Sequence, residues 1–217
     1  MSVDTRSSST AALSVPVTET AGVGQKPTSR WLRGHVPGEA GIWIFILGDM
    51  TLYIGLFAGF MVDRTKDVEL FNQCSSTLHI TIGGINTLLL LTSSLAVVFG
   101  VRALRERIAK KYAPLLFALA FLCGAGFVVN KYFEYGDLVT KGFTPYWNMF
   151  YLWYYVLTGI HLTHLLAGMW VLVYLFRVAQ KAQREETTIR GVESGASFWH
   201  CVDLLWVVLF PLLYLMR

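Results

Sequence analysis

Five long apolar segments constrain this 217-residue chain more than any other feature. They cover residues 41–61, 79–101, 112–132, 150–176 and 197–216, and together they make up more than half of the sequence. A helix of about 20 apolar residues spans the ~30 Å hydrocarbon core of a bilayer. Only 15% of the residues are charged, whereas soluble domains have about a quarter. The pattern predicts an all-α, polytopic membrane protein with a five-transmembrane-helix bundle over residues 35–217.

Residues 1–34 differ in composition from everything that follows. They are rich in Ser, Thr, Ala, Gly and Val, and they lack the 7–15-residue apolar run of a signal peptide. Such a segment cannot bury enough apolar surface to fold alone. We therefore expect a disordered cytoplasmic tail over residues 1–34.

The Lys and Arg residues are distributed asymmetrically between the two ends of the apolar segments. Thirteen of the eighteen fall on the side of the N-terminus, and cytoplasmic loops carry the excess of Lys and Arg. The sequence therefore predicts a cytoplasmic N-terminus and a C-terminus outside, and we expect no nucleic-acid partner despite the net charge of +4. The five on the outer side are Arg64, Lys66, Lys131, Lys141 and Arg217.

Polar residues interrupt all five apolar segments and fall on helical stripes. A charged group in the middle of a bilayer costs about 2.5–3.5 kcal/mol, so it usually faces the bundle or a functional site. The candidates for such interior positions are Asp49, Asn86, Thr87, Glu134, His161, His164, His200 and Asp203. Small residues let helices approach closely. The candidates for helix packing are Gly48, Gly55, Gly59, Gly159 and Gly168.

The histidines allow two interpretations. His161 and His164 lie three residues apart in "TGIHLTHLLAGMW", and His200 lies in the last apolar segment. Pairs such as His161 with His200, or His79 with His164, could bind haem from two sides, which would make the chain a free-standing membrane haem or metal-binding protein. Alternatively, each imidazole hydrogen-bonds a group on a neighbouring helix and holds the bundle together. Copper or zinc would need three or four converging ligands.

A small transporter or channel is a third, weaker alternative. Asp49, Glu134 and Asp203 could line a path through the bundle, but the sequence has no internal repeat and few Gly or Pro interruptions, which disfavours a secondary transporter. It also lacks a Gly-rich phosphate loop, GxSxG and HExxH. Its three cysteines include no CxxC, so we expect neither a disulfide framework nor a cysteine metal site.

Taken together, the polar stripes resemble those of subunit III of the haem–copper respiratory oxidases. The resemblance covers all five segments in order, and it is closest to a five-helix bacterial branch that includes accessory proteins encoded with nitric oxide reductases. The family typically has Ser-Glu or Ala-Glu where this chain has Gly48-Asp49, and Cys201 stands where an aromatic residue is common. The stretches that carry the resemblance are "WIFILGDM" (43–50), "INTLLLLTSS" (85–94), "KYFEYGDLV" (131–139), "TGIHLTHLLAGMW" (158–170) and "FWHCVDLLWVVLFPLLYL" (198–215).

This resemblance implies a role that periodicity alone cannot indicate. It implies a cofactor-free accessory or structural subunit, with no catalytic residue and no metal, in the inner membrane of a bacterium. Its partner would be catalytic subunit I of a cytochrome c oxidase-type enzyme of aerobic electron transport, or of a related nitric oxide reductase. Family members are thought to stabilise the catalytic subunit, support its proton delivery and hold membrane lipids.

Asp49 and the pair of His200 with Asp203 give the sharpest structural expectations. Asp49 lies eight residues into its apolar segment, and no basic residue is expected in the apolar core of any segment to neutralise it. We expect Asp49 to be buried on the face that carries Gly48, uncharged, and bonded to a hydroxyl, amide or imidazole or to the catalytic subunit. In the resembling family the matching carboxylate lies within the bundle and reacts with carbodiimides. We expect His200 and Asp203 to face the bundle, near the cytoplasmic ends of the segments at 79–101 and 150–176.

Overall fold

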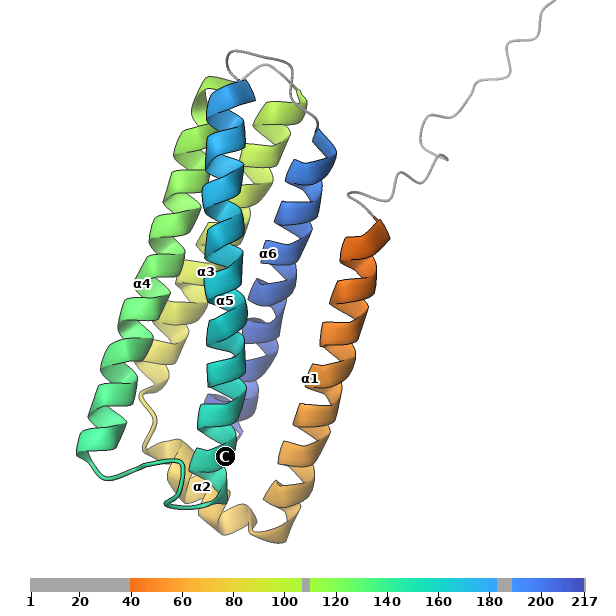
Figure 1. The fold of residues 1–217 in the computed structure, drawn as a ribbon. Coiled ribbons are helices and arrows are strands. Elements are labelled where there is room, and N and C mark those ends of the chain that lie inside the picture. The colour runs from red at the N-terminus through yellow and green to blue at the C-terminus, as the bar shows by residue number, and fades with distance from the viewer. Residues whose placement is uncertain (1–39, 107–109, 183–188, 217) are drawn as a thin grey trace, which may run out of the picture. The chain divides into compact units, whose positions relative to one another are not determined.

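The computed structural model describes residues 40–106, 110–182 and 189–216. The predicted tail over residues 1–34 lies outside the described residues. Helices account for nearly all of the described residues (Figure 1).

Among the described residues, five helices are long and apolar enough to cross a membrane, which confirms the predicted all-α, five-helix architecture. A short helix and two single turns complete the described part of the chain. The elements are α1 (Ala40–Lys66), α2 (Val68–Ser76), α3 (Ile80–Arg105), a 3₁₀ turn η1 (Lys110–Tyr112), α4 (Ala113–Thr140), α5 (Met149–Ala182), α6 (Ile189–Phe210) and a π-helical turn η2 (Pro211–Leu215).

The helices extend beyond the predicted apolar segments. The segment predicted to end at residue 132 continues to Thr140, and α6 begins at Ile189 rather than at residue 197. In these extensions Glu134 pairs with Lys131, and Glu193 pairs with Arg105. A helix can therefore continue where hydropathy alone predicts its end.

Helix α2 was not predicted from the sequence. The Asp67 side chain accepts a hydrogen bond from the Leu70 backbone N–H, which caps the first turn, and Glu69 lies in that turn, where the helix dipole favours an acidic group. The helix buries Phe71 and Cys74 against the ends of the neighbouring helices. Its Ser75 hydroxyl also lies 3.5 Å from the carbonyl oxygen of Met216, so the C-terminal end of the chain packs at this end of the bundle (Figure 1).

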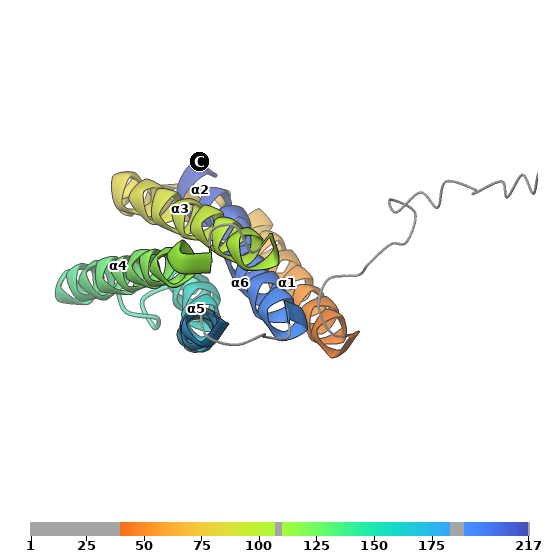
Figure 2. The same cartoon turned by 90° about the horizontal axis from the view of Figure 1, so that it is seen from above.

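Helices α3, α4, α5 and α6 form the closely packed part of the bundle. Helix α4 packs against α3 and α5, and α6 packs against α3 and α5. Helix α1 lies at the edge of the bundle next to α6 in both views, and it buries the least of the five spanning helices (Figures 1 and 2). Its attachment therefore depends on a small number of contacts.

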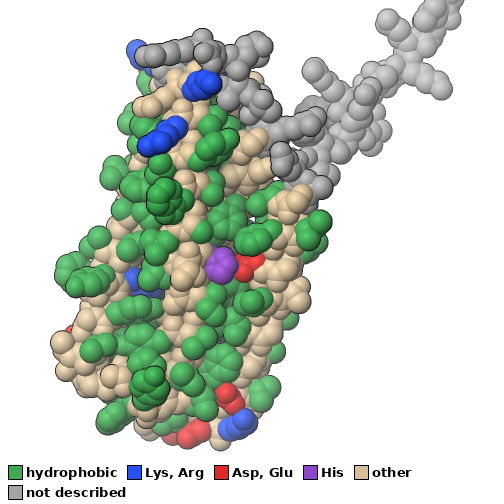
Figure 3. All heavy atoms as spheres, viewed as in Figure 1, with side chains coloured by type: hydrophobic (Ala, Val, Ile, Leu, Met, Phe, Trp, Pro, Cys, Tyr) green, Lys and Arg blue, Asp and Glu red, His purple; other side chains and the backbone are tan. Residues whose placement is uncertain are grey.

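The outer face of the bundle is apolar along most of its length. Large apolar side chains cover the face in Figure 3, and the lysine and arginine side chains seen there lie mainly toward its two ends. Soluble monomers rarely expose contiguous apolar patches larger than a few hundred Å². Such a surface fits contact with lipid. Examples of strongly exposed apolar residues are Ile44, Leu47, Leu88, Leu115 and Leu122.

Glycine at position 168 makes room for a fully buried indole ring. A Cβ added at Gly168 would lie 2.8 Å from a ring atom of Trp199, a residue with no exposed surface. On the same helix, a Cβ added at Gly159 would meet no atom within 4 Å. The two glycines thus form a matched pair for testing close packing.

We predict that Gly168→Ala lowers the thermal stability of the purified protein, whereas Gly159→Ala leaves it unchanged or raises it. Overpacking a close contact costs about 1–3 kcal/mol, and replacing a helical glycine by alanine gains up to about 1 kcal/mol. Thermal unfolding followed by circular dichroism in mild detergent measures both. Equal effects of the two substitutions would mean that the Trp199 ring can move aside.

Candidate functional site

Three groups of polar side chains lie between the helices, and each joins different elements. The Lys131 cluster consists of Lys131, Glu134, Tyr154 and Tyr214 and joins α4, α5 and η2. The Asp49–His164 pair joins α1 to α5. The Ser94 cluster consists of Ser94 and His200, with Asp203 one turn beyond His200 on α6, and it joins α3 to α6.

The Lys131 cluster is a closed network around a buried ammonium group. The Lys131 Nζ lies 2.9 Å from Glu134 Oε2, 2.8 Å from the Tyr214 hydroxyl and 3.2 Å from the Tyr154 hydroxyl. The Tyr214 hydroxyl in turn donates to Glu134 Oε1 at 2.6 Å. The side chains of Lys131 and Glu134 are each 2% exposed. All three hydrogens of the ammonium group have an acceptor, and both carboxylate oxygens have a donor.

The position of Lys131 corrects two predictions. Lys131 is not an outer-loop charge, and the expectation that no basic residue lies in the core of the apolar segments is wrong. The error arose because the third segment was taken to end at residue 132, whereas α4 continues through the cluster. The missed signal is the Lys-x-x-Glu spacing, which places Glu134 one turn beyond Lys131 on the same face of the helix. The rings of Tyr154 and Trp206, each 5.0 Å from Nζ, complete the surroundings of the cation.

We predict that Lys131→Met destabilises the protein more than Lys131→Met combined with Glu134→Gln. Removing one partner of a buried ion pair costs about 3–5 kcal/mol, because it leaves the other charge without compensation. Chemical denaturation of the four members of this double-mutant cycle measures the coupling. Lys141→Met is the matched control, since the Lys141–Asp137 pair at the end of the same helix is exposed and should contribute little. A double variant no more stable than the single one would contradict a charge-paired cluster.

The Asp49 carboxyl group and the His164 ring lie within hydrogen-bonding distance of each other. His164 Nδ1 lies 2.8 Å from the carbonyl oxygen of Ile160, which can only accept, so Nδ1 carries a hydrogen. His164 Nε2 lies 3.0 Å from Asp49 Oδ1. One proton between these two atoms makes the pair either imidazolium and carboxylate or imidazole and carboxylic acid, and both forms are neutral overall. An imidazole is among the partners expected for Asp49. The Asp49 side chain is 7% exposed.

The charge state of Asp49 remains a prediction, and infrared spectroscopy can test it. We expect the band of a protonated carboxyl group near neutral pH, lost in Asp49→Asn, and carbodiimide labelling of Asp49 in preference to the exposed Asp67. Because an amide can still donate to Nε2, Asp49→Asn should keep α1 attached, whereas Asp49→Leu should cost about 1–3 kcal/mol by leaving the ring unpaired. Absence of the band together with equal labelling of both residues would assign the proton to His164.

The Ser94 cluster lies between α3 and α6. The Ser94 hydroxyl lies 2.7 Å from His200 Nδ1. Asp203 is 6% exposed, and its Oδ1 has no hydrogen-bond partner among the described residues. The partner of His200 thus comes from α3, the helix formed by the segment predicted at 79–101.

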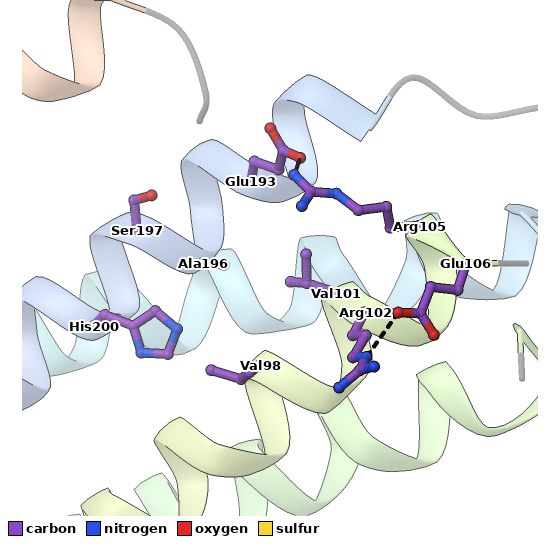
Figure 4. A pocket seen from close by; sticks show the side chains of 9 residues that line it. All are labelled: Val98, Val101, Arg102, Arg105, Glu106, Glu193, Ala196, Ser197 and His200. Carbon is purple, nitrogen blue, oxygen red and sulfur yellow. Dashed lines mark hydrogen bonds and ion pairs between the residues drawn. The ribbon is translucent and has the colours of Figure 1, made fainter. Parts of the chain in front are cut away.

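A cavity of about 380 Å³ opens beside this cluster (Figure 4). It lies between the last turns of α3 and the first half of α6, where Figure 4 shows Arg105 paired with Glu193 and Arg102 paired with Glu106. Its lining residues are Val98, Val101, Arg102, Arg105, Glu106, Glu193, Ala196, Ser197 and His200.

The remaining interior candidates make smaller contacts. Asn86 Oδ1 accepts a hydrogen bond from Asn130 Nδ2 at 2.8 Å, and Thr87 Oγ1 accepts one from Trp206 Nε1 at 3.0 Å. His161 is fully buried between the rings of Phe127 and Trp206, and neither of its nitrogens has a hydrogen-bond partner among the described residues. Among all the residues that the structure describes, no three His, Cys, Asp or Glu side chains converge as metal ligands would.

The candidate packing glycines divide into two groups. Gly59 and Gly168 lie against the indole rings of Trp153 and Trp199. Gly48, Gly55 and Gly159 meet no other atom of the described chain within 4 Å of an added Cβ. Packing by these last three remains a prediction, which requires a neighbour outside the described residues.

The fold and these clusters define a class: a multi-pass helical membrane protein whose interior polar groups bind one helix to another. Residues 34–217 match the family described as cytochrome c oxidase subunit III, and the chain belongs to this family. It is 29% identical to cytochrome c oxidase subunit 3 of Synechocystis sp., over 84% of this chain and 82% of the relative. It is 28% identical to the same subunit of Bacillus sp. (strain PS3), over 81% and 84%. It is also 28% identical to cytochrome bo(3) ubiquinol oxidase subunit 3 of Pseudomonas putida, again over 81% and 84%.

Proposed function

We propose that this chain is an accessory subunit of a respiratory haem–copper oxidase in a bacterial inner membrane. It packs beside the haem-bearing catalytic subunit I and carries no redox centre itself. The observation that carries the proposal is the family match over residues 34–217, which includes all five spanning helices. The relatives include subunits named for cytochrome c and for ubiquinol oxidases, so the proposal rests on the oxidase class and not on one electron donor.

The geometry supports a structural contribution to such a complex. Buried charge is neutralised inside the chain in the Lys131 cluster and in the Asp49–His164 pair, so these groups need no metal or haem to compensate them. Their contacts hold α1 and the C-terminal turn to the rest of the bundle. A subunit with fixed helices can present a stable lateral surface to subunit I and to membrane lipids. Support of proton delivery to the catalytic subunit is part of the same proposal.

The topology proposed from the loops is a cytoplasmic N-terminus and an outer C-terminus. Because Lys131 is buried in α4, it no longer counts as a loop charge. Four basic residues then remain on the outer side against thirteen on the cytoplasmic side, which strengthens the asymmetry. The end of the bundle that carries Arg102 and Arg105 then faces the cytoplasm.

A nitric oxide reductase is the second candidate for the served enzyme. The observation that favours it is the count of five spanning helices, which matches the accessory branch that the sequence resembles. Oxygen and nitric oxide consumption by membranes from a strain lacking this chain would separate the two. Loss or faster inactivation of oxygen consumption supports the oxidase, and an effect confined to nitric oxide consumption supports the reductase.

We predict that the tagged chain, solubilised from native membranes in mild detergent, brings down a larger haem-bearing subunit. The chain separated from that subunit should show no Soret band, and His161→Ala should leave the haem spectrum of the complex unchanged. A free-standing cytochrome would instead show a Soret band in the isolated chain that His161→Ala, His164→Ala or His200→Ala removes. A transporter would carry out flux in liposomes without any partner. Isolation of the chain without a partner, from cells whose oxidase is fully active in its absence, would contradict the accessory role.

A further inference from the structure

The Tyr214 hydroxyl group in the Lys131 cluster has a proton acceptor in place. It donates to Glu134 Oε1 at 2.6 Å, the distance typical of a hydrogen bond from a hydroxyl group to an ionised carboxylate. The other carboxylate oxygen of Glu134 accepts from Lys131 Nζ at 2.9 Å, and the same Nζ donates to the Tyr214 oxygen at 2.8 Å. The phenol proton of Tyr214 therefore already lies within transfer distance of a base.

Two neighbouring tyrosines lack this arrangement. The Tyr154 hydroxyl lies 3.2 Å from the same Nζ, but in the described part of the chain no hydrogen bond joins it to a carboxylate. The Tyr135 hydroxyl is bonded to Thr158 Oγ1 at 2.6 Å, and a hydroxyl group is too weak a base to keep a phenol proton. Tyr154 and Tyr214 thus form a matched pair, because both contact the ammonium group and they differ in the proton acceptor.

The position of Tyr214 is closed to water but close to the surface of the bundle. Tyr214 has no exposed surface, and the Glu134 side chain is 2% exposed. Leu215, the next residue along the chain, is 51% exposed. An electron can leave the Tyr214 ring by tunnelling through a thin layer of protein, whereas a molecule in solution cannot reach the ring to react with it. A radical on Tyr214 therefore persists longer than one on an exposed tyrosine.

We propose that Tyr214 is a redox-active tyrosine and that Glu134 holds its proton while the ring is oxidised. A phenol that loses an electron becomes a strong acid, so its oxidation is easiest where the proton can move at the same time to a base. One electron passes from the Tyr214 ring to a one-electron oxidant of the oxygen-radical class, while the O–H bond of Tyr214 breaks and an O–H bond forms at Glu134 Oε1. The products are the reduced oxidant, a neutral tyrosyl radical and a protonated Glu134. Re-reduction by one electron returns the proton to Tyr214.

The surroundings of Lys131 accommodate the charge that this step leaves behind. Before oxidation the Lys131 ammonium and the Glu134 carboxylate cancel, and afterwards Lys131 carries one net positive charge. The rings of Tyr154 and Trp206, each with its centroid 5.0 Å from Nζ, attract that cation. The inference goes beyond the proposed accessory role, because it assigns one-electron chemistry to a side chain of this subunit and requires no haem or metal in it.

The test is electron paramagnetic resonance of the full-length chain in mild detergent. Flash-excited tris(bipyridine)ruthenium, with pentaamminechlorocobalt(III) as the electron acceptor, is the oxidant, and the sample is frozen after radicals on exposed residues such as Tyr132 and Tyr146 have decayed. We expect a tyrosyl signal whose hyperfine lines collapse when the chain carries ring-deuterated tyrosine. Tyr214→Phe should abolish this signal, whereas the matched control Tyr154→Phe should retain it.

Glu134→Gln tests the proton acceptor, because an amide cannot hold the phenol proton, and we expect it to abolish the signal as well. This change leaves Lys131 without its opposite charge, so the same measurement is made on Lys131→Met combined with Glu134→Gln, with circular dichroism to verify the helices. A signal that survives Tyr214→Phe, a signal that persists in the folded double variant, or no tyrosyl signal from the wild-type chain overturns the proposal. None of these results involves the catalytic subunit, so they leave the proposed accessory role unaffected.

Discussion

The ammonium group of Lys131 is buried, so water cannot compensate its charge. The packing of several helices depends on how that charge is paired. An isolated charge in a low-dielectric interior is costly enough that it must be paired and fully hydrogen-bonded. Glu134 supplies the opposite charge from the same helix, while Tyr154 and Tyr214 supply oxygen atoms from α5 and from η2. Neutralising one side chain therefore fixes the relative positions of three elements.

The π-helical turn η2 contributes to the same pairing of the Lys131 charge. Pro211 has no backbone N–H and cannot continue an α-helical ladder, so the hydrogen bonding changes register at this residue. The Met216 N–H reaches back to the Pro211 carbonyl at 3.1 Å, and the intervening turn carries Tyr214 into the Lys131 cluster. Pro211 thus helps to orient a buried hydroxyl group.

The sequence predicts the number, order and approximate position of the spanning helices because each is a long apolar run. It also predicts that polar stripes occupy helix faces, since that follows from the 3.6-residue period. It could not predict α2, whose nine residues are too few for a clear periodic pattern, or the ends of α4 and α6, where paired charges extend helices past the apolar run. Nor could it predict that His164 pairs with Asp49 while His161 lies among aromatic rings, because that choice depends on how α5 is rotated against α1 and α6.

The residue that completes the Lys131 cluster is synthesised well after the lysine itself. Tyr214 follows Lys131 by 83 positions, so α4 is synthesised before the tyrosine hydroxyl exists. During insertion the charge of Lys131 is balanced by Glu134 alone, one turn away on the same helix. The intrahelical pair thus allows Lys131 to enter the membrane with its charge balanced, and the arrival of η2 converts that pair into a contact between helices. Closure of this part of the bundle therefore waits until Tyr214 has been synthesised.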